Sequence, residues 1–180
     1  MAGSTLITER LILRPWYAED YAPFAALNAD PRVTATLAGN LTRDESDAFA
    51  DRIATHIDEH GWGLWAIEIK EGAPFIGYAG LSRPRFDAPF TPCVEIGWRL
   101  AFEHWRHGYA TEAARAVLDF GFNVLRLPEI VSFTTIGNTR SRKVMERIGL
   151  VRDPAGDFDH PSLSPDHPLR PHVLYRKGRL

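Results

Sequence analysis

The stretch Glu95–Phe122, EIGWRLAFEHWRHGYATEAARAVLDFGF, decides the fold because it joins a strand to a helix through a short basic turn. Gly97 interrupts the apolar strand, which is typical of a bulge or of a close backbone approach. The turn carries Arg106, His107 and Gly108 and leads directly into the helix. The first N–H groups of a helix have no internal partner and carry partial positive charge, so they can bind a phosphate group.

The residues alone leave two explanations of this turn open. A single glycine before a helix can simply make a tight turn, and that is the commoner case. The turn is not a Walker loop, because no Gly-Lys-Ser/Thr follows, and two of the three glycines of a dinucleotide-binding fingerprint are missing. In the second explanation Gly108 lets an anion approach the main chain, and Arg106 and His107 add positive charge.

The remaining sequence predicts an α+β domain around one mixed sheet. Alternating or β-branched apolar residues predict strands at 6–15, 62–70, 74–83, 92–101, 129–137 and 172–177. Apolar residues at helical spacing predict helices at 18–30, limited by Pro23, and at 42–61, 108–125 and 138–150. Residues 153–171 carry five prolines and are expected to form a long loop, of the kind that is usually functional or disordered.

Length and charge limit the classes of function. A chain of 180 residues favours a single domain spanning residues 1–180. The net charge of −2 gives no basic field for nucleic acid, and no window approaches the ~20 apolar residues that a membrane helix needs. Cys93 is the only cysteine, which excludes a disulfide within the chain and makes a reducing cytoplasm the simplest location. The histidines form no HExxH pair, so no metal is expected.

Three motifs occur in order along the chain. They are T-x-R-L-x-L-R at Thr8–Arg14, W-x-x-G-Y-A-T-E-A at Trp105–Ala113, and N-x-x-S-x-x-V-x-x-x-x-G-L at Asn138–Leu150. Together they resemble the GNAT superfamily of N-acetyltransferases, and most closely its RimJ/RimL-type branch, named for ribosomal-protein alanine acetyltransferases. Many superfamily members have Gln or Arg where this chain has Trp105, but Trp is usual for this branch.

The resemblance implies a mostly antiparallel mixed sheet whose two central parallel strands, Val94–Ala101 and Glu129–Thr135, splay apart between flanking helices. The pantetheine arm of acetyl-CoA would lie in that gap, against the first strand at Gly97, Trp98, Arg99 and Leu100. The pyrophosphate would bind N–H groups of the loop, at Arg106, His107, Gly108, Tyr109, Ala110 and Thr111. The resemblance also implies that Asn138 bonds the pantetheine arm and that Ser141 lies near the sulfur.

Acetyl transfer to an amine requires a neutral amine and a way to protonate the leaving thiolate. Glu95 is the candidate base, because some GNAT enzymes use a glutamate on this strand; otherwise it is an exposed carboxylate or one paired with an arginine. Ser141 is the candidate acid, since the helix lacks the tyrosine that many relatives use there; otherwise its hydroxyl serves the first helix N–H groups. Asn138 can also cap this helix. Arg142 and Lys143 fit a solvated helix face better than a phosphate site.

The sequence therefore predicts a cytoplasmic N-acetyltransferase that uses acetyl-CoA and no metal. Its acceptor is a primary amine, either a protein N-terminus or a small molecule, and direct attack requires no enzyme nucleophile. Two alternatives stay open: a non-catalytic acyl-CoA-binding or sensor module, and a nucleotide-binding domain unrelated to CoA. Residues 42–60 and 153–171 are expected to shape the choice of acceptor. No nucleic-acid or membrane partner is expected, and a homodimer is left open.

Overall fold

The computed structural model describes residues 3–179, which form an eight-stranded mixed sheet flanked by helices. The order across the sheet is β1-β2-β3-β4-β5-β6-β8-β7. Its strands are β1 (Leu6–Ile7), β2 (Leu11–Arg14), β3 (Leu64–Ile69), β4 (Gly77–Ser82), β5 (Glu95–Leu100), β6 (Glu129–Thr135), β7 (Val151–Asp159) and β8 (Pro171–Gly178). Every neighbouring pair is antiparallel except β5 and β6, which are parallel. The predicted α+β fold is confirmed.

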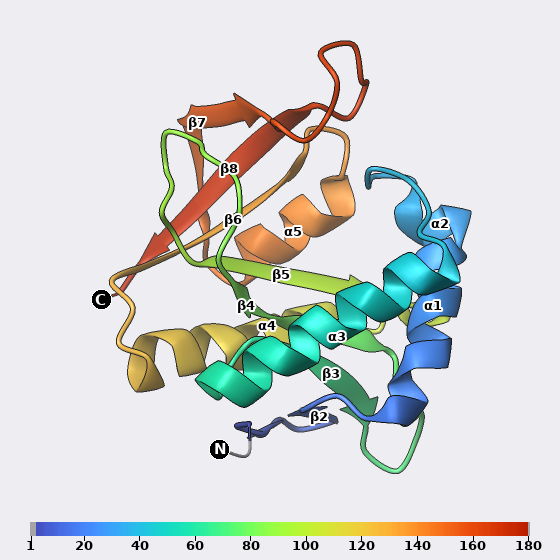
Figure 1. The fold of residues 1–180 in the computed structure, drawn as a ribbon. Helices are drawn as coiled ribbons and strands as arrows, with labels where there is room; N and C mark the ends of the chain where they lie inside the picture. The colour runs from blue at the N-terminus through green and yellow to red at the C-terminus, as the bar shows by residue number, and fades with distance from the viewer. Residues whose placement is uncertain (1–2, 180) are drawn as a thin grey trace.

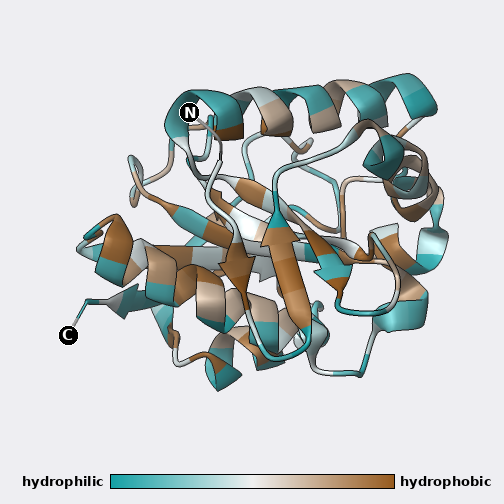
Figure 2. Cartoon of the chain, turned by 90° about the horizontal axis from the view of Figure 1, so that it is seen from below, coloured by the Kyte–Doolittle hydropathy of each residue, from teal (hydrophilic) through white to brown (hydrophobic). Residues whose placement is uncertain are grey.

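Helices cover both faces of the sheet (Figure 1). They are α1 (Tyr21–Ala29), α2 (Pro31–Thr34), α3 (Arg43–His60), α4 (Tyr109–Asp119) and α5 (Thr139–Arg147), with short 3₁₀ or π turns at 18–20, 102–104 and 120–124. Helices α1–α3 lie on one face of strands β2–β5 and α4 on the other, while α5 packs beside β6 (Figure 1). The outward side of α3 is hydrophilic in Figure 2, as expected for a helix that buries Ile53 and Ile57 against the sheet.

The two central strands separate soon after they begin. In the described part of the chain, β5 and β6 share one register pair, Glu95 with Val131, and beside it Val131 N donates to Val94 O at 3.0 Å. The next link is a side-chain bond, from Ser132 Oγ to Ile96 O at 2.8 Å. Figure 1 shows the strands diverging beyond this point. Because main-chain groups alternate along a strand, those of Trp98 face the open gap.

Capping residues define the helices as the sequence predicts. Thr42 and Glu45 form the capping box of α3, with Glu45 Oε2 accepting from Thr42 N at 2.8 Å, and the left-handed Gly61 (φ 76°) ends the helix. Asn138 Oδ1 accepts a hydrogen bond from Ser141 N at 3.2 Å at the start of α5. These short-range signals define where the two helices begin and where α3 ends.

Three sequence-based boundaries were wrong. Residues 6–15 form two paired strands rather than one, because Thr8 bonds Leu11 and closes a turn between them. Pro23 does not limit α1, since it lies in the first helical turn, where its missing N–H has no partner to lose. The first half of segment 153–171 is strand β7, which bulges between Asp153 and Phe158 around Pro154; the loop itself is 160–170.

Candidate active site

The turn before α4 presents unpartnered backbone N–H groups. Arg106 (φ 66°) and Gly108 (φ 84°) both adopt left-handed conformations, which is uncommon for a residue such as arginine and concentrates at functional sites. Across residues 3–179, no protein oxygen accepts a hydrogen bond from the backbone N–H groups of residues 106–111. A turn of this kind at a helix N-terminus is a concave site for an anion.

A hydrogen-bond network fixes this turn to the N-terminal strands. Glu112, in the first turn of α4, accepts bonds from Thr8 Oγ1 at 2.6 Å, Arg10 N at 2.8 Å and Arg10 Nε at 2.7 Å. Arg10 Nη1 in turn donates to His107 O at 3.0 Å. Burial opposes the charge of Glu112, but the bonds from Thr8 and Arg10 outweigh it and lower the pKa of Glu112. These hydrogen bonds therefore join residues of the first sequence motif to residues of the second.

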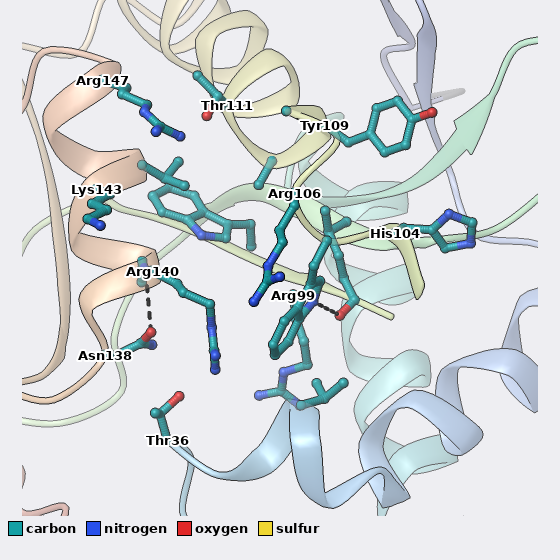
Figure 3. Close-up of a pocket in the computed structure, with 18 of the residues that line it drawn as sticks. Thr36, Arg99, His104, Arg106, Tyr109, Thr111, Asn138, Arg140, Lys143 and Arg147 are labelled. Atoms are coloured by element: carbon teal, nitrogen blue, oxygen red, sulfur yellow. Dashed lines mark hydrogen bonds between the residues drawn. The ribbon is translucent and has the colours of Figure 1, made fainter. Parts of the chain in front are cut away.

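A cleft of about 240 Å³ lies between this turn, β5 and α5. Its cationic side chains come from the turn and from α5, and Figure 3 shows Arg106 and Arg140 reaching into its middle. The Arg140 guanidinium lies 4.2 Å from the centre of the Trp105 ring, a cation–π contact. Lys143 and Arg147 line the α5 side. Lys143 is exposed, as predicted for a solvated helix face, and it also lines the cleft.

Most of the predicted cofactor residues line this first cleft: Trp98, Arg99, Leu100, Arg106, Gly108, Tyr109, Ala110, Thr111, Asn138 and Ser141. His107 does not; its carbonyl is held by Arg10 and its ring stacks on Tyr109, with centroids 5.5 Å apart. The carbonyl of Leu100 is also occupied, since it accepts the Trp105 indole N–H at 2.8 Å. On β5, the main-chain N–H and C=O groups of Trp98 are therefore the ones that face the gap and can bind a ligand there.

A second cavity, of about 380 Å³, adjoins the first. The two share the lining residues Thr36, Leu37, Trp98, Arg99, Asn138 and Ser141. Glu95 and Gly97 line the second cavity and, two apart on β5, lie on the same face of the sheet. A Cβ built on Gly97 would meet only Glu95 Oε1, at 3.9 Å. The absent side chain therefore leaves room in front of the Glu95 carboxyl.

Glu95 has the properties of a group that exchanges protons near neutral pH. Burial raises the pKa of Glu95 to about 8, and a hydrogen bond with Ser82, directly opposite on β4, offsets this only in part. Among the described residues Glu95 forms no ion pair, and its side chain is half-buried at the cavity wall. Glu95 is therefore neither a well-exposed carboxylate nor the partner of an arginine.

Ser141 and Asn138 lie where the two cavities meet. In the part of the chain described, the Ser141 hydroxyl forms no hydrogen bond, because Asn138 caps the helix instead. The Asn138 amide also donates from Nδ2 to Thr134 Oγ1 at 2.9 Å, so it retains one hydrogen and one lone pair for a ligand. Arg142 turns the other way and bonds Tyr175 Oη at 3.2 Å.

His172 was not among the predicted site residues, and His160 was included only as part of segment 153–171, which was expected to shape the choice of acceptor. Both line the second cavity, and their ring centroids are 5.0 Å apart. Burial lowers the pKa of both imidazoles, and the neighbouring His172 lowers that of His160 further. They meet because β7 pairs with β8, and β7 is the strand that the sequence did not reveal. No group of three or more His, Cys, Asp or Glu within residues 3–179 is arranged to hold a metal ion.

Comparisons with known proteins define the class. The chain belongs to the GNAT family of acetyltransferases, because the model of the acetyltransferase (GNAT) domain matches residues 10–151. It is therefore an acetyltransferase, of a family that uses acetyl-CoA. It is 33% identical over 159 residues to FsC-acetyl coenzyme A-N(2)-transacetylase of Aspergillus fumigatus, covering 83% of this chain and 66% of that protein.

Solved structures agree with the family. The acetyltransferase from Agrobacterium tumefaciens matches with a TM-score of 0.78 and 30% identity, over 99% of this chain and 96% of that one. RimJ of Mycobacterium smegmatis, solved with CoA-disulfide, matches with a TM-score of 0.76 and 20% identity, over 99% and 90% of the two chains. The second likeness concerns the fold, and it accords with the RimJ/RimL-like motifs in the sequence.

Proposed function

We propose that this acetyltransferase transfers the acetyl group of acetyl-CoA to a primary amine by direct attack, with Glu95 as the base. The proposal rests on one observation. In the second cavity, the half-buried carboxyl of Glu95, with a pKa of about 8, lies next to the space that the missing side chain of Gly97 leaves open. A base with this pKa is matched to an amine near neutral pH. The names of N-acetyltransferase relatives support an amine acceptor.

The residues of the first cleft fit acetyl-CoA, which would supply the activated acetyl thioester. The unpartnered N–H groups of residues 106–111 suit its pyrophosphate, and Arg106, Lys143 and Arg147 add charge suited to phosphate. The main chain of Trp98 faces the gap where the pantetheine arm would pair as a strand does. Asn138 keeps hydrogen-bonding capacity at the same place.

The chain's own groups can then complete the proton balance. An α-ammonium has a pKa near 8 and a lysine-type ammonium near 10, so the first more readily loses a proton to solvent and becomes the neutral amine. As the new N–C bond forms and the C–S bond breaks, the neutral amine releases one proton to Glu95. The thiolate gains one proton from solvent, either directly or through the Ser141 hydroxyl, which takes a proton from solvent in turn. The N–H of Trp98 is the main-chain donor available in the gap for the carbonyl oxygen.

The test is thiol release from acetyl-CoA with a panel of primary amines that includes peptides beginning with Ala and Ser. Glu95→Gln should lower kcat by about 10²–10⁴, the usual range for losing a general base. Binding of acetyl-CoA, measured by calorimetry, should be unchanged. Wild-type turnover by Glu95→Gln from pH 6 to 9 would contradict the proposal.

The proposal also covers the location and the domain organisation of the enzyme. No helix among the described residues is long and apolar enough to cross a bilayer. We infer a cytoplasmic enzyme in which residues 1–180 act as one acetyltransferase domain, with the sole cysteine, Cys93, outside the chemistry. Whether it acts as a homodimer can be measured by light scattering of the purified protein.

A further inference from the structure

Apolar and aromatic groups form part of the wall of the second cavity, and the rest consists mainly of uncharged hydroxyl and amide side chains, Glu95 and Arg99. Three leucines, three aromatic rings and two imidazoles contribute to its wall: Leu37, Leu163, Leu169, Tyr78, Trp98, Phe133, His160 and His172. Its volume of about 380 Å³ is within the range of small-molecule pockets, roughly 300–1,000 Å³. A wall of this composition favours a ligand with an apolar or aromatic body.

The charged residues of the cavity also limit which ligands it can bind. Glu95 is the only acidic residue that lines it, and its carboxyl is the proposed base. Arg99 is the one permanent cation of the lining, and it is engaged: its Nη1 donates to Asn28 Oδ1 at 2.5 Å, and it lies 5.7 Å from the Tyr78 ring centre. A second ammonium group on the acceptor would lose its water without gaining a carboxylate, which costs free energy.

The part of the wall formed by loop 160–170 and His172 of β8 is anchored at its base. His160 N donates to Arg170 O at 2.8 Å, and Arg170 Nη1 donates to Leu163 O at 3.2 Å across the loop. Behind them Phe133 packs edge-on to Phe158, with ring centroids 5.4 Å apart. Hydrogen bonds and aromatic packing therefore hold this part of the wall in place.

We propose that the acceptor is a small primary amine with an apolar or aromatic body that carries no second charged group, positive or negative; this rests on the proposed function. Such an amine places its nitrogen at Glu95, over Gly97, and its body against Phe133, His172 and the leucines of loop 160–170. Polyamines, aminoglycosides and other polycations are excluded, because the cavity offers one carboxyl and several apolar side chains.

The test compares kcat/KM for phenethylamine, phenylalanine, spermidine, kanamycin and a hexapeptide beginning with Ala, by thiol release. Phenethylamine should exceed each of the others by ~10-fold or more, as expected when a mismatched charged group must be buried. Equal or higher kcat/KM with spermidine, kanamycin, phenylalanine or the peptide would overturn this acceptor class. If acetyl-CoA binds but no amine releases thiol, the proposed function itself fails, so the two failures are distinguishable.

A charge placed in the wall gives a second test. Ser162 is exposed on loop 160–170 and lines the cavity, so Ser162→Asp adds a carboxylate there, and Ser162→Asn is its neutral control of equal size. The ratio of kcat/KM for spermidine to that for phenethylamine should be ~5-fold higher in S162D than in S162N, the effect of one partly screened ion pair. An identical ratio in the two variants would contradict selection by charge.

Discussion

The two cavities of this enzyme are built in different ways. The first depends on backbone N–H groups and on contacts between motif residues, such as the bonds that Glu112 receives from Thr8 and Arg10. The second is assembled from side chains of segments far apart in the sequence, between Thr36 and His172. The difference teaches that the proposed cofactor site depends on short motifs, whereas the proposed acceptor site depends on tertiary packing between distant segments.

The largest effect should come from Glu95, which belongs to the second cavity alone. With a pKa of about 8 for this carboxyl, wild-type kcat/KM expressed for the unprotonated amine should rise with pH and level off above about pH 8, since only the ionised carboxyl accepts a proton. Glu95→Gln should lower activity by about 10²–10⁴ and abolish this titration. The pH profile of both enzymes checks it, with an amine of known pKa. A Gln variant that keeps the wild-type profile would show that another group is the base.

The next effect belongs to the first cavity. Glu112→Gln keeps the shape of the side chain but removes the charge that holds Arg10, so the loop at residues 106–108 should lose its fixed position. We expect the Kd for acetyl-CoA to rise by ~10-fold, the cost of about one charge-assisted hydrogen bond, while KM for the amine changes little. Calorimetry measures it, with the exposed Glu59→Gln as control. An equal rise in the Kd for acetyl-CoA and in the KM for the amine would contradict the assignment of separate roles to the two cavities.

A smaller effect is expected at Gly97. Because a Cβ there meets no protein atom nearer than 3.9 Å, Gly97→Ala should leave the free energy of unfolding within about 0.5 kcal/mol of wild type. The methyl group should still raise KM for the amine several-fold, since it occupies the space before Glu95. Gly80→Ala, on the facing strand, is the contrast: its Cβ would lie 1.9 Å from Gly63 O, so it should destabilise the fold. Denaturant unfolding and steady-state kinetics of both variants decide it.

The last effect concerns stability and not activity. Burial raises the pKa of Glu95 from 4.5 to about 8, so between these values the folded state binds more protons than the unfolded state. The free energy of unfolding should therefore contain a contribution from Glu95 that decreases as pH rises from about 4.5 to about 8. Denaturant unfolding at several pH values should show a shallower decline in Glu95→Gln than in wild type. Parallel curves would mean that Glu95 titrates normally in the folded protein.

The same contrast explains what the sequence could predict. Gly108, Asn138 and the Thr42–Glu45 box act within one turn of the chain, so their roles in turns and caps could be predicted directly. The splayed strands were implied by the motifs and are confirmed by the single register pair between Glu95 and Val131. The family and its acetyltransferase activity were predicted correctly on the same motifs.

What could not be predicted depends on strand pairing. Strand β7 is masked by Pro154 and Gly156, and its bulge breaks the alternation that would reveal it. Without the pairing of β7 with β8, nothing in the sequence places His160 beside His172 in the wall of the second cavity. The raised pKa of Glu95 likewise arises from burial by distant residues, so composition alone could not give it. The catalytic roles of Glu95 and Ser141 stay predictions.

The most direct measurement is a crystal structure of the enzyme with CoA and phenethylamine. Backbone N–H groups of residues 106–111 should then donate to pyrophosphate oxygens, the pantetheine arm should bond Trp98 between β5 and β6, and the amine should contact Glu95. A pyrophosphate bound elsewhere with these N–H groups still unpartnered, or an amine seated away from Glu95, would contradict the account.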